Sequence, residues 1–355
     1  MSGGDGGSLL EAGWLTGAAP CPHVVLSSRI RFARNLAGSR FAPHAPRESL
    51  EKIRARVLDA AAAIPAFAEF DRLDLAELGA AERALLKETR LISKEMERAA
   101  PGRAVFFARD RKASVMVNEE DHLRIQCIEP GLQLDKCLAR ASGLEEALGA
   151  ALPFAIHKRF GYLTACPSNV GTGLRASVML HLPALTLLRE VEDLFGMLGQ
   201  HGLAVRGFNG ENSEFLGDFY QFSNEVTLGR SVEEILRALG AMITRLIERE
   251  EEARATLFRD KAPLLDDSIW RSYGVLTNAR RMNSKEAMAL LSRLRLGIDR
   301  GYFRSLTHEE LNRLFIVIQP AHLGRRYADA PPDDVEARDV SRAVFLRERF
   351  AAERN

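Results

Sequence analysis

The sequence is poor in cysteine and lysine, and the scarcity of cysteine excludes two kinds of structural support. The four cysteines, at 21, 127, 137 and 166, show no Cys-x-x-Cys spacing. Neither a structural metal site nor a disulfide framework is therefore expected, and a reducing cytoplasm fits. No apolar run approaches the roughly 20 residues that span a bilayer, so we expect no membrane segment. The opening MSGGDGGSLLEAGW lacks the basic and apolar stretches of a signal peptide.

Charge of one sign is also lacking, because 49 basic residues stand against 48 acidic ones. This balance excludes a protein that binds DNA through its overall charge, since neutralising phosphates needs surplus cations. Only eight of the basic residues are lysine, so 41 are arginine. The abundance of Ala and Gly favours the base composition of the genome as the main cause of the excess of arginine over lysine. The alternative is that some arginines bind phosphate, for which a planar bidentate guanidinium is suited.

The pattern of apolar residues predicts an α+β protein with two domains. Helical spacing occurs at 47–62, 80–98, 134–150 and 183–200, and strands are expected at 104–108, 113–117, 122–128, 162–165, 175–182, 203–207 and 219–224. A long helix should begin after Ser231 and run to about 257, and further helices are expected at 263–279, 284–297, 307–318 and 334–353. We therefore expect a flexible N-terminus at 1–20, a mixed domain at 21–257 and a helical domain at 258–355.

The first segment that carries unusual polar residues is Ser27-Ser28-Arg29-Ile30-Arg31. If it is a strand, Arg29 and Arg31 point to the same side, because strand side chains alternate. Two adjacent guanidinium groups repel unless an anion joins them. Surface salt bridges are the simpler explanation of this segment taken alone.

The second segment is Asn118-Glu119-Glu120-Asp121-His122-Leu123-Arg124, in which three acids lead into a strand. Alternation predicts that Glu120, His122 and Arg124 share one face. This would place a carboxylate, an imidazole and a fixed cation together. A charged hairpin turn explains the segment equally well.

The third and fourth segments are loops between predicted strands. Residues 166–177 read CPSNVGTGLRAS, a Gly/Ser/Thr loop that can turn backbone N–H groups towards an anion but is not a Walker A loop. Cys166 is either a small buried side chain or, beside arginines, a thiolate. Residues 206–214 read RGFNGENSE and carry Arg206 and Glu211 between glycines, which is also typical of an ordinary flexible loop.

Together the four segments supply five arginines, two carboxylates, a Gly-rich loop and a cysteine. Phosphoryl transfer from ATP to a guanidinium needs this combination: cations and Mg²⁺ to hold the phosphates, and carboxylates to grip the acceptor and take its proton. The motifs NEEDHLR, CPSN-x-GTGLRASV, SSRIR and RG-x-x-GE resemble, in the same order, those of the phosphagen kinase superfamily, which includes creatine and arginine kinases.

This resemblance implies a catalytic domain with an antiparallel sheet flanked by helices, followed here by an all-α C-terminal domain. It implies Glu120, Glu211 and Cys166 as catalytic residues, with Glu120 the preferred base. It implies nucleotide contacts from these residues: Ser27, Ser28, Arg29, Ile30, Arg31, Arg124, Arg175, Ala176, Ser177, Val178, Met179, Arg206, Gly207, Phe208, Asn209 and Gly210. Arg90, in RLIS, stands where the relatives that this sequence resembles have a histidine that contributes to the nucleotide site.

Two departures from small-molecule kinases bear on the substrate. The helical domain that precedes SxRxR in those enzymes is missing here, and a helical region follows the catalytic domain. That region contains Arg338, Asp339, Val340, Ser341, Arg342 and Ala343, which resembles the RDxxRA element of bacterial McsB-type protein arginine kinases. In that family the element binds phosphoarginine away from the active site. On its own chemistry, RDVSRA is an ordinary piece of amphipathic helix.

The leading hypothesis is therefore a cytoplasmic kinase of arginine side chains in proteins, using ATP and Mg²⁺ without a dedicated protein metal site. The resemblance implies a zinc-containing activator protein, a Clp-type protease that acts on marked substrates, and a homodimer. A kinase of free arginine or another small guanidino compound is the alternative within enzymes. An inactive phosphoarginine-binding adaptor is the alternative of another class. Direct binding of nucleic acid has only the arginine count in its favour.

Overall fold

The computed structural model describes residues 11–16, 19–192, 194, 202–208, 215–327 and 334–351. An eight-stranded sheet lies at its centre, with strand order β2-β3-β4-β5-β1-β8-β10-β9 and antiparallel pairing throughout. Its strands are β1 (Val25–Arg34), β2 (Phe70–Asp74), β3 (Ala104–Ala108), β4 (Ala113–Val117), β5 (Leu123–Pro130), β8 (Leu174–His181), β9 (Leu203–Arg206) and β10 (Phe219–Asn224). A separate hairpin pairs β6 (Ile156–His157) with β7 (Gly161–Tyr162).

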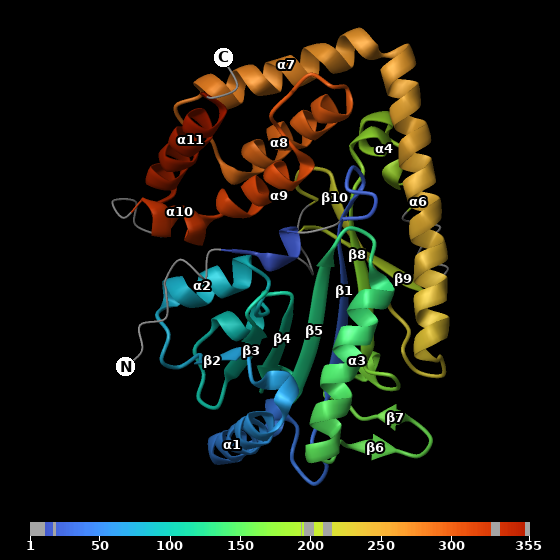
Figure 1. The fold of residues 1–355 in the computed structure, drawn as a ribbon, viewed down its shortest axis with the longest axis vertical. Coiled ribbons are helices and arrows are strands. Elements are labelled where there is room, and N and C mark those ends of the chain that lie inside the picture. The colour runs from blue at the N-terminus through green and yellow to red at the C-terminus, as the bar shows by residue number, and fades with distance from the viewer. Residues whose placement is uncertain are drawn as a thin grey trace.

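Helices cover one face of this sheet and the ends of its strands (Figure 1). In the first part of the chain these are α1 (Arg47–Ala63), α2 (Ala80–Glu88), α3 (Leu134–Ala151) and α4 (Pro183–Leu188). The 3₁₀ turns are η2 (Gly13–Leu15), η3 (Ala42–His44), η4 (Pro65–Phe67), η5 (Glu95–Glu97) and η6 (Pro167–Asn169). Helix α3 packs on β1 and β5, where Ile30 and Cys127 are fully buried. Apolar side chains alternate along the central strands, and this alternation determines which face of the sheet the helices cover.

The second part of the chain is helical. It consists of α6 (Val232–Asp260), α7 (Ala262–Asn278), α8 (Ser284–Asp299), α9 (His308–Val317), α10 (Pro320–Arg326) and α11 (Val335–Ala351). Helix α6 runs along one side of the sheet, and the later helices gather beyond the strand ends (Figure 1). Helix α6 begins after Ser231, as predicted, and Ser231 and Glu234 form a capping box there. At the start of α9, the Thr307 hydroxyl accepts the Glu310 N–H. None of the described helices is long and apolar enough to cross a membrane.

Most predicted elements are present, and the strands at 104–108, 113–117 and 219–224 match residue for residue. The helix predicted over 80–98 is wrong beyond Glu88. Thr89 folds its hydroxyl onto Leu85 O, and Arg90 adopts a left-handed conformation (φ 67°) that cannot continue the helix. Of the strand predicted over 162–165, only Tyr162 is in a strand, as the second residue of β7. The helix predicted over 183–200 ends at Leu188, and Leu194 is again helical; residues 193 and 195–200 lie outside the described part.

Candidate active site

The uncovered face of the sheet carries the polar residues, because alternation separates the two sets of side chains. Arg29 and Arg31 both point to this face from β1. Directly paired residues of an antiparallel sheet share a face, so Ser177 opposite Arg29, and Arg175 and Gln126 opposite Arg31, point there too. The prediction that Arg29 and Arg31 lie side by side on a strand is confirmed.

A cavity of about 1940 Å³ lies over this polar face. All five predicted arginines line it, and so do Glu120 and Cys166: the side chains concerned are Arg29, Arg31, Arg124, Arg175, Arg206, Glu120 and Cys166. The cavity brings together segments that are far apart in the sequence, and it continues outward between α2 and the α10–α11 region.

Like charges crowd the inner part of this cavity. Burial, and then the neighbouring guanidinium groups, lower the pKa of Arg29 to about 9. The pKa of Arg31 lies well below its usual value for the same two reasons. Arg31 Nε is buried and has no hydrogen-bond partner among the described residues. An anion with several charges would relieve this repulsion, so the arrangement fits a nucleotide polyphosphate.

Hydrogen bonds hold the other arginines in place. Arg29 donates to Gln221 Oε1 (2.8 Å) and more weakly to Ser177 Oγ (3.4 Å). Arg175 donates to Ser223 Oγ at 3.2 Å. Gln221 and Ser223 alternate on β10, so the strand that neighbours β8 presents both acceptors to the polar face. The guanidinium groups are thereby oriented before any ligand arrives.

The acidic turn at 118–122 differs from the prediction. Asn118 is left-handed (φ 57°), so the turn does not continue the alternation of the strand. His122 is fully buried, accepts the Leu36 N–H at Nδ1, and contacts Arg40 O. The expected grouping of Glu120, His122 and Arg124 on one face is therefore wrong, because His122 is part of the packing around Leu36. Burial also lowers the pKa of His122.

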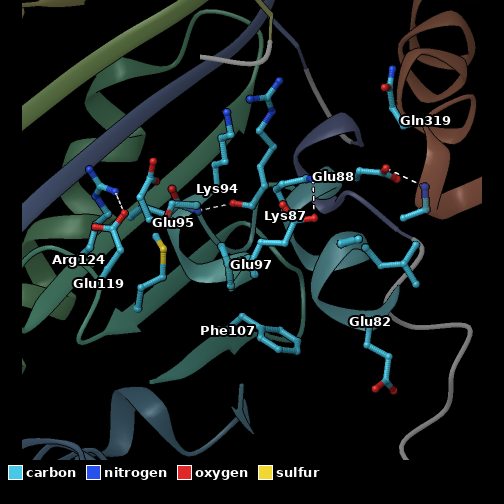
Figure 2. A pocket seen from close by; sticks show the side chains of 18 of the residues that line it. Glu82, Lys87, Glu88, Lys94, Glu95, Glu97, Phe107, Glu119, Arg124 and Gln319 are labelled. Carbon is cyan, nitrogen blue, oxygen red and sulfur yellow. Dashed lines mark hydrogen bonds and ion pairs between the residues drawn. The ribbon is translucent and has the colours of Figure 1, made fainter. Parts of the chain in front are cut away.

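Two neighbours of Glu120 explain its position. Glu119 forms the ion pair with Arg124 (Figure 2). Asp121 Oδ1 accepts hydrogen bonds from Asn35 Nδ2 and from Ala165 N, both at 2.6 Å. Because Ala165 precedes Cys166, Asp121 ties the acidic turn to the cysteine loop. This tie places Glu120 and Cys166 on the wall of the same cavity.

The cysteine loop is fixed by side-chain hydroxyls. Thr164 Oγ1 donates to Cys166 O at 2.7 Å, and Cys166 Sγ lies 3.0 Å from Ser168 Oγ. From beyond β10, Thr227 Oγ1 donates to Ser168 O (2.9 Å) and Val170 O (2.7 Å). Cys166 is half-buried and lines the cavity, whereas Cys127 and Cys137 are fully buried.

The remaining predicted nucleotide residues fall into three groups. Ser27, Ser177 and Met179 line a second, small pocket, and Arg29 lines this pocket as well as the main cavity. Phe208 lines the main cavity. Gly207 is buried at the end of β9. Alternate residues point to the covered face and do not line the cavity: Ser28, Ile30, Ala176 and Val178. Asn209, Gly210 and Glu211 lie outside the described residues.

Three residues that line the cavity, Gln126, Gln221 and Arg90, were not among the nucleotide contacts predicted from the sequence. Gln126 and Gln221 line the cavity, and their alternation with the arginines on paired strands is the signal that could have found them. Arg90 also lines it, stacked 4.9 Å above the ring of Phe208 and bonded to Phe208 O. Burial lowers the pKa of Arg90 to about 10. Arg90 therefore lies on the cavity wall together with the five predicted arginines.

The RDVSRA element lies on α11 at the outer part of the cavity. Arg338 lines the cavity, and Val340 is exposed. Arg342 instead is 2% exposed and donates to Ile318 O (3.0 Å), Met282 O (2.8 Å) and Asp339 Oδ1 (2.7 Å). Ser341 is half-buried and Ala343 is buried. The two arginines of the element thus have different surroundings.

The outer cavity is bounded by α2 on one side and α10 on the other (Figure 2). Glu88, at the end of α2, accepts hydrogen bonds from Ala321 N (2.8 Å) and His322 N (3.1 Å), and contacts His322 Nδ1 at 2.6 Å. Lys87 pairs with Glu97 at 2.7 Å on the same wall. The contacts of Glu88 hold α10 against α2.

Comparison with known proteins first identifies the class. Residues 52–253 match the family model of the ATP:guanido phosphotransferase C-terminal catalytic domain. A solved lombricine kinase structure has a TM-score of 0.60 and 26% identity, and the match covers 69% of this chain and 71% of that one. A duplicated taurocyamine kinase from Schistosoma mansoni has a TM-score of 0.61 at 26% identity, over 66% of this chain and 34% of that one. The fold is that of the phosphagen kinases.

The second part of the chain narrows the class. Residues 262–355 match the model of the protein-arginine kinase McsB C-terminal domain. A protein-arginine kinase from Geobacillus stearothermophilus is 42% identical over 99% of this chain and 97% of the relative. One from Moorella thermoacetica is 43% identical over 95% of this chain and 97% of its own length. The chain belongs to the protein-arginine kinase family of ATP:guanido phosphotransferases.

Proposed function

We propose that the chain transfers the γ-phosphoryl group of ATP to the guanidinium of arginine side chains in proteins. The observation that carries the proposal is the convergence of five arginines, Glu120 and Cys166 on one cavity wall. Crowded cations that are already oriented by hydrogen bonds favour a polyphosphate and the charge that develops on it during transfer.

In this mechanism, Glu120 receives the acceptor. Its carboxylate binds the guanidinium and takes a proton from the attacking nitrogen as that nitrogen forms the bond to the γ-phosphorus. The bond from the γ-phosphorus to the β,γ-bridging oxygen breaks, and ADP departs with its electron pair. Arg124, held by Glu119, and Arg175, held by Ser223, are well placed to balance the charge on the leaving phosphate.

The roles proposed for Cys166 and Glu211 are subsidiary. Cys166 would lie beside the guanidinium, since its loop is tied through Asp121 to the turn that carries Glu120. Glu211 would be the second carboxylate that aligns the acceptor. Mg²⁺, when bound, supplies positive charge at the β- and γ-phosphates. No cluster of acidic, histidine or cysteine side chains suited to a metal occurs among the described residues. In this proposal, Mg²⁺ binds through ATP.

The finer aspects of the proposal concern domains, regulation and partners. We place the catalytic domain at 21–257 and the regulatory and dimerisation domain at 258–355. Within RDVSRA, the surroundings favour Arg338 as the residue that contacts phosphoarginine, while Arg342 supports the helix internally. A zinc-containing activator, a Clp-type protease, a homodimer and a cytoplasmic location belong to the same proposal, and the family resemblance supports them.

One experiment separates the proposed function from its alternatives. The protein is incubated with Mg–ATP and either free L-arginine or an arginine-rich protein, and acid-labile phosphate is measured on each acceptor. We expect label on the protein. Label on free arginine alone would favour a metabolite kinase, and ATP binding without label on either acceptor would favour the adaptor.

A matched pair of variants tests the base. Glu120→Gln should reduce transfer by at least a hundredfold, the usual contribution of general base catalysis, while nucleotide affinity stays within about twofold. Glu95→Gln is the control, because Glu95 lines the outer part of the same cavity and is exposed (Figure 2). Equal losses in the two variants would contradict the role of Glu120.

A further inference from the structure

The β6–β7 hairpin carries apolar side chains that face solvent. Ile156 is 61% exposed and Phe160 is 40% exposed. Leu228, which follows β10, is 50% exposed. Single exposed apolar residues are common on protein surfaces, but a group of them beside a catalytic cavity indicates an interaction surface.

Two glycines bring these residues together. A Cβ on Gly161 (φ 72°) would lie 2.6 Å from Gly171 O, and a Cβ on Gly171 (φ 113°) would lie 2.8 Å from the Cα of Leu228. Only glycine allows this approach with these backbone angles. The hairpin that carries Phe160 and the segment that carries Leu228 therefore both pack against Gly171. We call Ile156, Phe160 and Leu228 the rim patch.

The rim patch is continuous with the cysteine side of the proposed active site. Tyr162 pairs with Gly171 through two backbone hydrogen bonds of 2.8 and 3.2 Å. Thr227, next to Leu228, bonds to the carbonyl of Ser168, and Ser168 lines the cavity beside Cys166. A chain whose arginine enters the cavity on this side would pass over the patch.

The charges around the patch limit which chain it can accept. Lys158 and Arg159 are exposed at the hairpin tip. The rings of His157 and Phe160 stack with their centroids 4.8 Å apart. The Arg159 guanidinium lies 5.4 Å from the centroid of the Phe160 ring. Residues 154–165 contain no acidic side chain. Positive charges on a bound chain would meet repulsion here, whereas apolar side chains would meet the rings.

We propose that the rim patch binds an extended segment of the protein substrate through apolar side chains that flank the target arginine. This inference rests on the proposed function and deepens it, because it names the substrate as a segment with exposed apolar residues and without neighbouring cations. Folded proteins bury such residues, so the patch would favour unfolded chains as substrates.

The test compares three peptides that differ only beside one arginine, which is flanked by leucine, serine or lysine. With the wild-type enzyme, we expect kcat/KM for the leucine peptide to exceed that for the serine peptide by about tenfold, and the lysine peptide to be poorest. A double variant, Phe160→Ser with Leu228→Ser, should bring the leucine to serine ratio close to one. It should leave kcat/KM for the serine peptide within about twofold.

The control is Leu264→Ser, which removes an apolar side chain on α7 that is 75% exposed. It should keep the wild-type ratio. An unchanged ratio in the double variant, or equal losses on both peptides, overturns the inference while leaving the proposed function intact. Loss of self-association in the double variant without a change in the ratio assigns the patch to a second copy of the chain and overturns it too. Phosphorylation of free arginine but of no peptide overturns the proposed function itself.

Discussion

Replacing Arg31 by methionine should make the ligand-free protein more stable and abolish its response to nucleotide. Arg31 makes no hydrogen bond among the described residues, and burial and the positive charges of Arg29, Arg124 and Arg175 lower its pKa. Methionine has a similar length and no charge. The substitution therefore removes repulsion without removing a hydrogen-bonding partner.

The size of the effect follows from the electrostatics of the cluster. The pKa of Arg29 falls to about 9 in the same surroundings. Since one pKa unit corresponds to about 1.4 kcal/mol, the fall from 12.5 to about 9 sets an upper limit of about 5 kcal/mol on the penalty of the charged form. Water in the open cavity screens part of it, so we expect a gain of roughly 1–2 kcal/mol, or about 2–4 °C in Tm for a domain of this size.

The pH dependence gives a second measure of the same penalty. A cationic group whose pKa is lowered on folding destabilises the folded state at every pH where it stays charged. The penalty is therefore complete below the lowered pKa of the folded protein, which is about 9 for Arg29, and it decreases as the pH rises from there towards the ordinary value of 12.5. The stability difference between Arg31→Met and wild type should be constant below the lowered pKa of Arg31 and shrink as the pH rises past it.

Thermal unfolding with and without ATP, and with and without inorganic pyrophosphate, measures both effects. Wild type should be stabilised by either anion, and Arg31→Met should not. Arg109→Met is the control, because the Arg109 side chain is 74% exposed and its ion pair with Glu69 is 3.9 Å long. A ligand-free Arg31→Met protein that is less stable than wild type and still responds to pyrophosphate would refute the reasoning.

Three further outcomes follow from buried groups. Glu88→Gln should lower the local stability of α10 by about 1 kcal/mol, because the Glu88 carboxylate accepts hydrogen bonds from the backbone amides of Ala321 and His322. Faster hydrogen exchange of these two amides would measure the loss. Arg342→Ala should lower the free energy of unfolding by about 3 kcal/mol, because two buried carbonyls lose their hydrogen-bond donor. Arg338→Ala should change this free energy by less than about 0.5 kcal/mol. Urea unfolding of the two variants measures both values. Iodoacetamide at pH 8.5 should alkylate Cys166 and spare Cys127, as peptide mass spectrometry would show. Burial raises the pKa of Cys127 to about 12 and keeps Cys127 a neutral thiol at this pH.

Alternation made the sheet and much of the polar face predictable. The spacing of Arg29 and Arg31 placed both on one side of a strand, and β1 has them there. The strands β3, β4 and β10 were predicted to the residue because turns with polar residues delimit them. The proposed roles of Glu120, Cys166 and Glu211 came from a family resemblance and stay predictions.

Alternation failed where side chains bend the backbone. In the acidic turn, Asn118 Nδ2 donates to Leu50 O and Gly102 O, and this holds a left-handed residue just before His122. The acceptors come from segments 16 and 68 residues away, which no local pattern reveals. Arg342 is a similar case: RDVSRA looks like an amphipathic helix, and its buried guanidinium is explained only by the carbonyls that face it.

The register of the central strands joins the requirements of the core to those of the proposed site. Arg175 faces Arg31, and Ala176 faces Ile30. A slip of one residue in β8 would turn every side chain of that strand to the other face, and Arg175 would enter a core in which Ile30 and Ala176 are fully buried. Burying an unpaired guanidinium costs far more than the repulsion among the cavity arginines. The apolar residues between the arginines thus hold like charges together, because a slip of one residue in this strand pair would bury a guanidinium in the core.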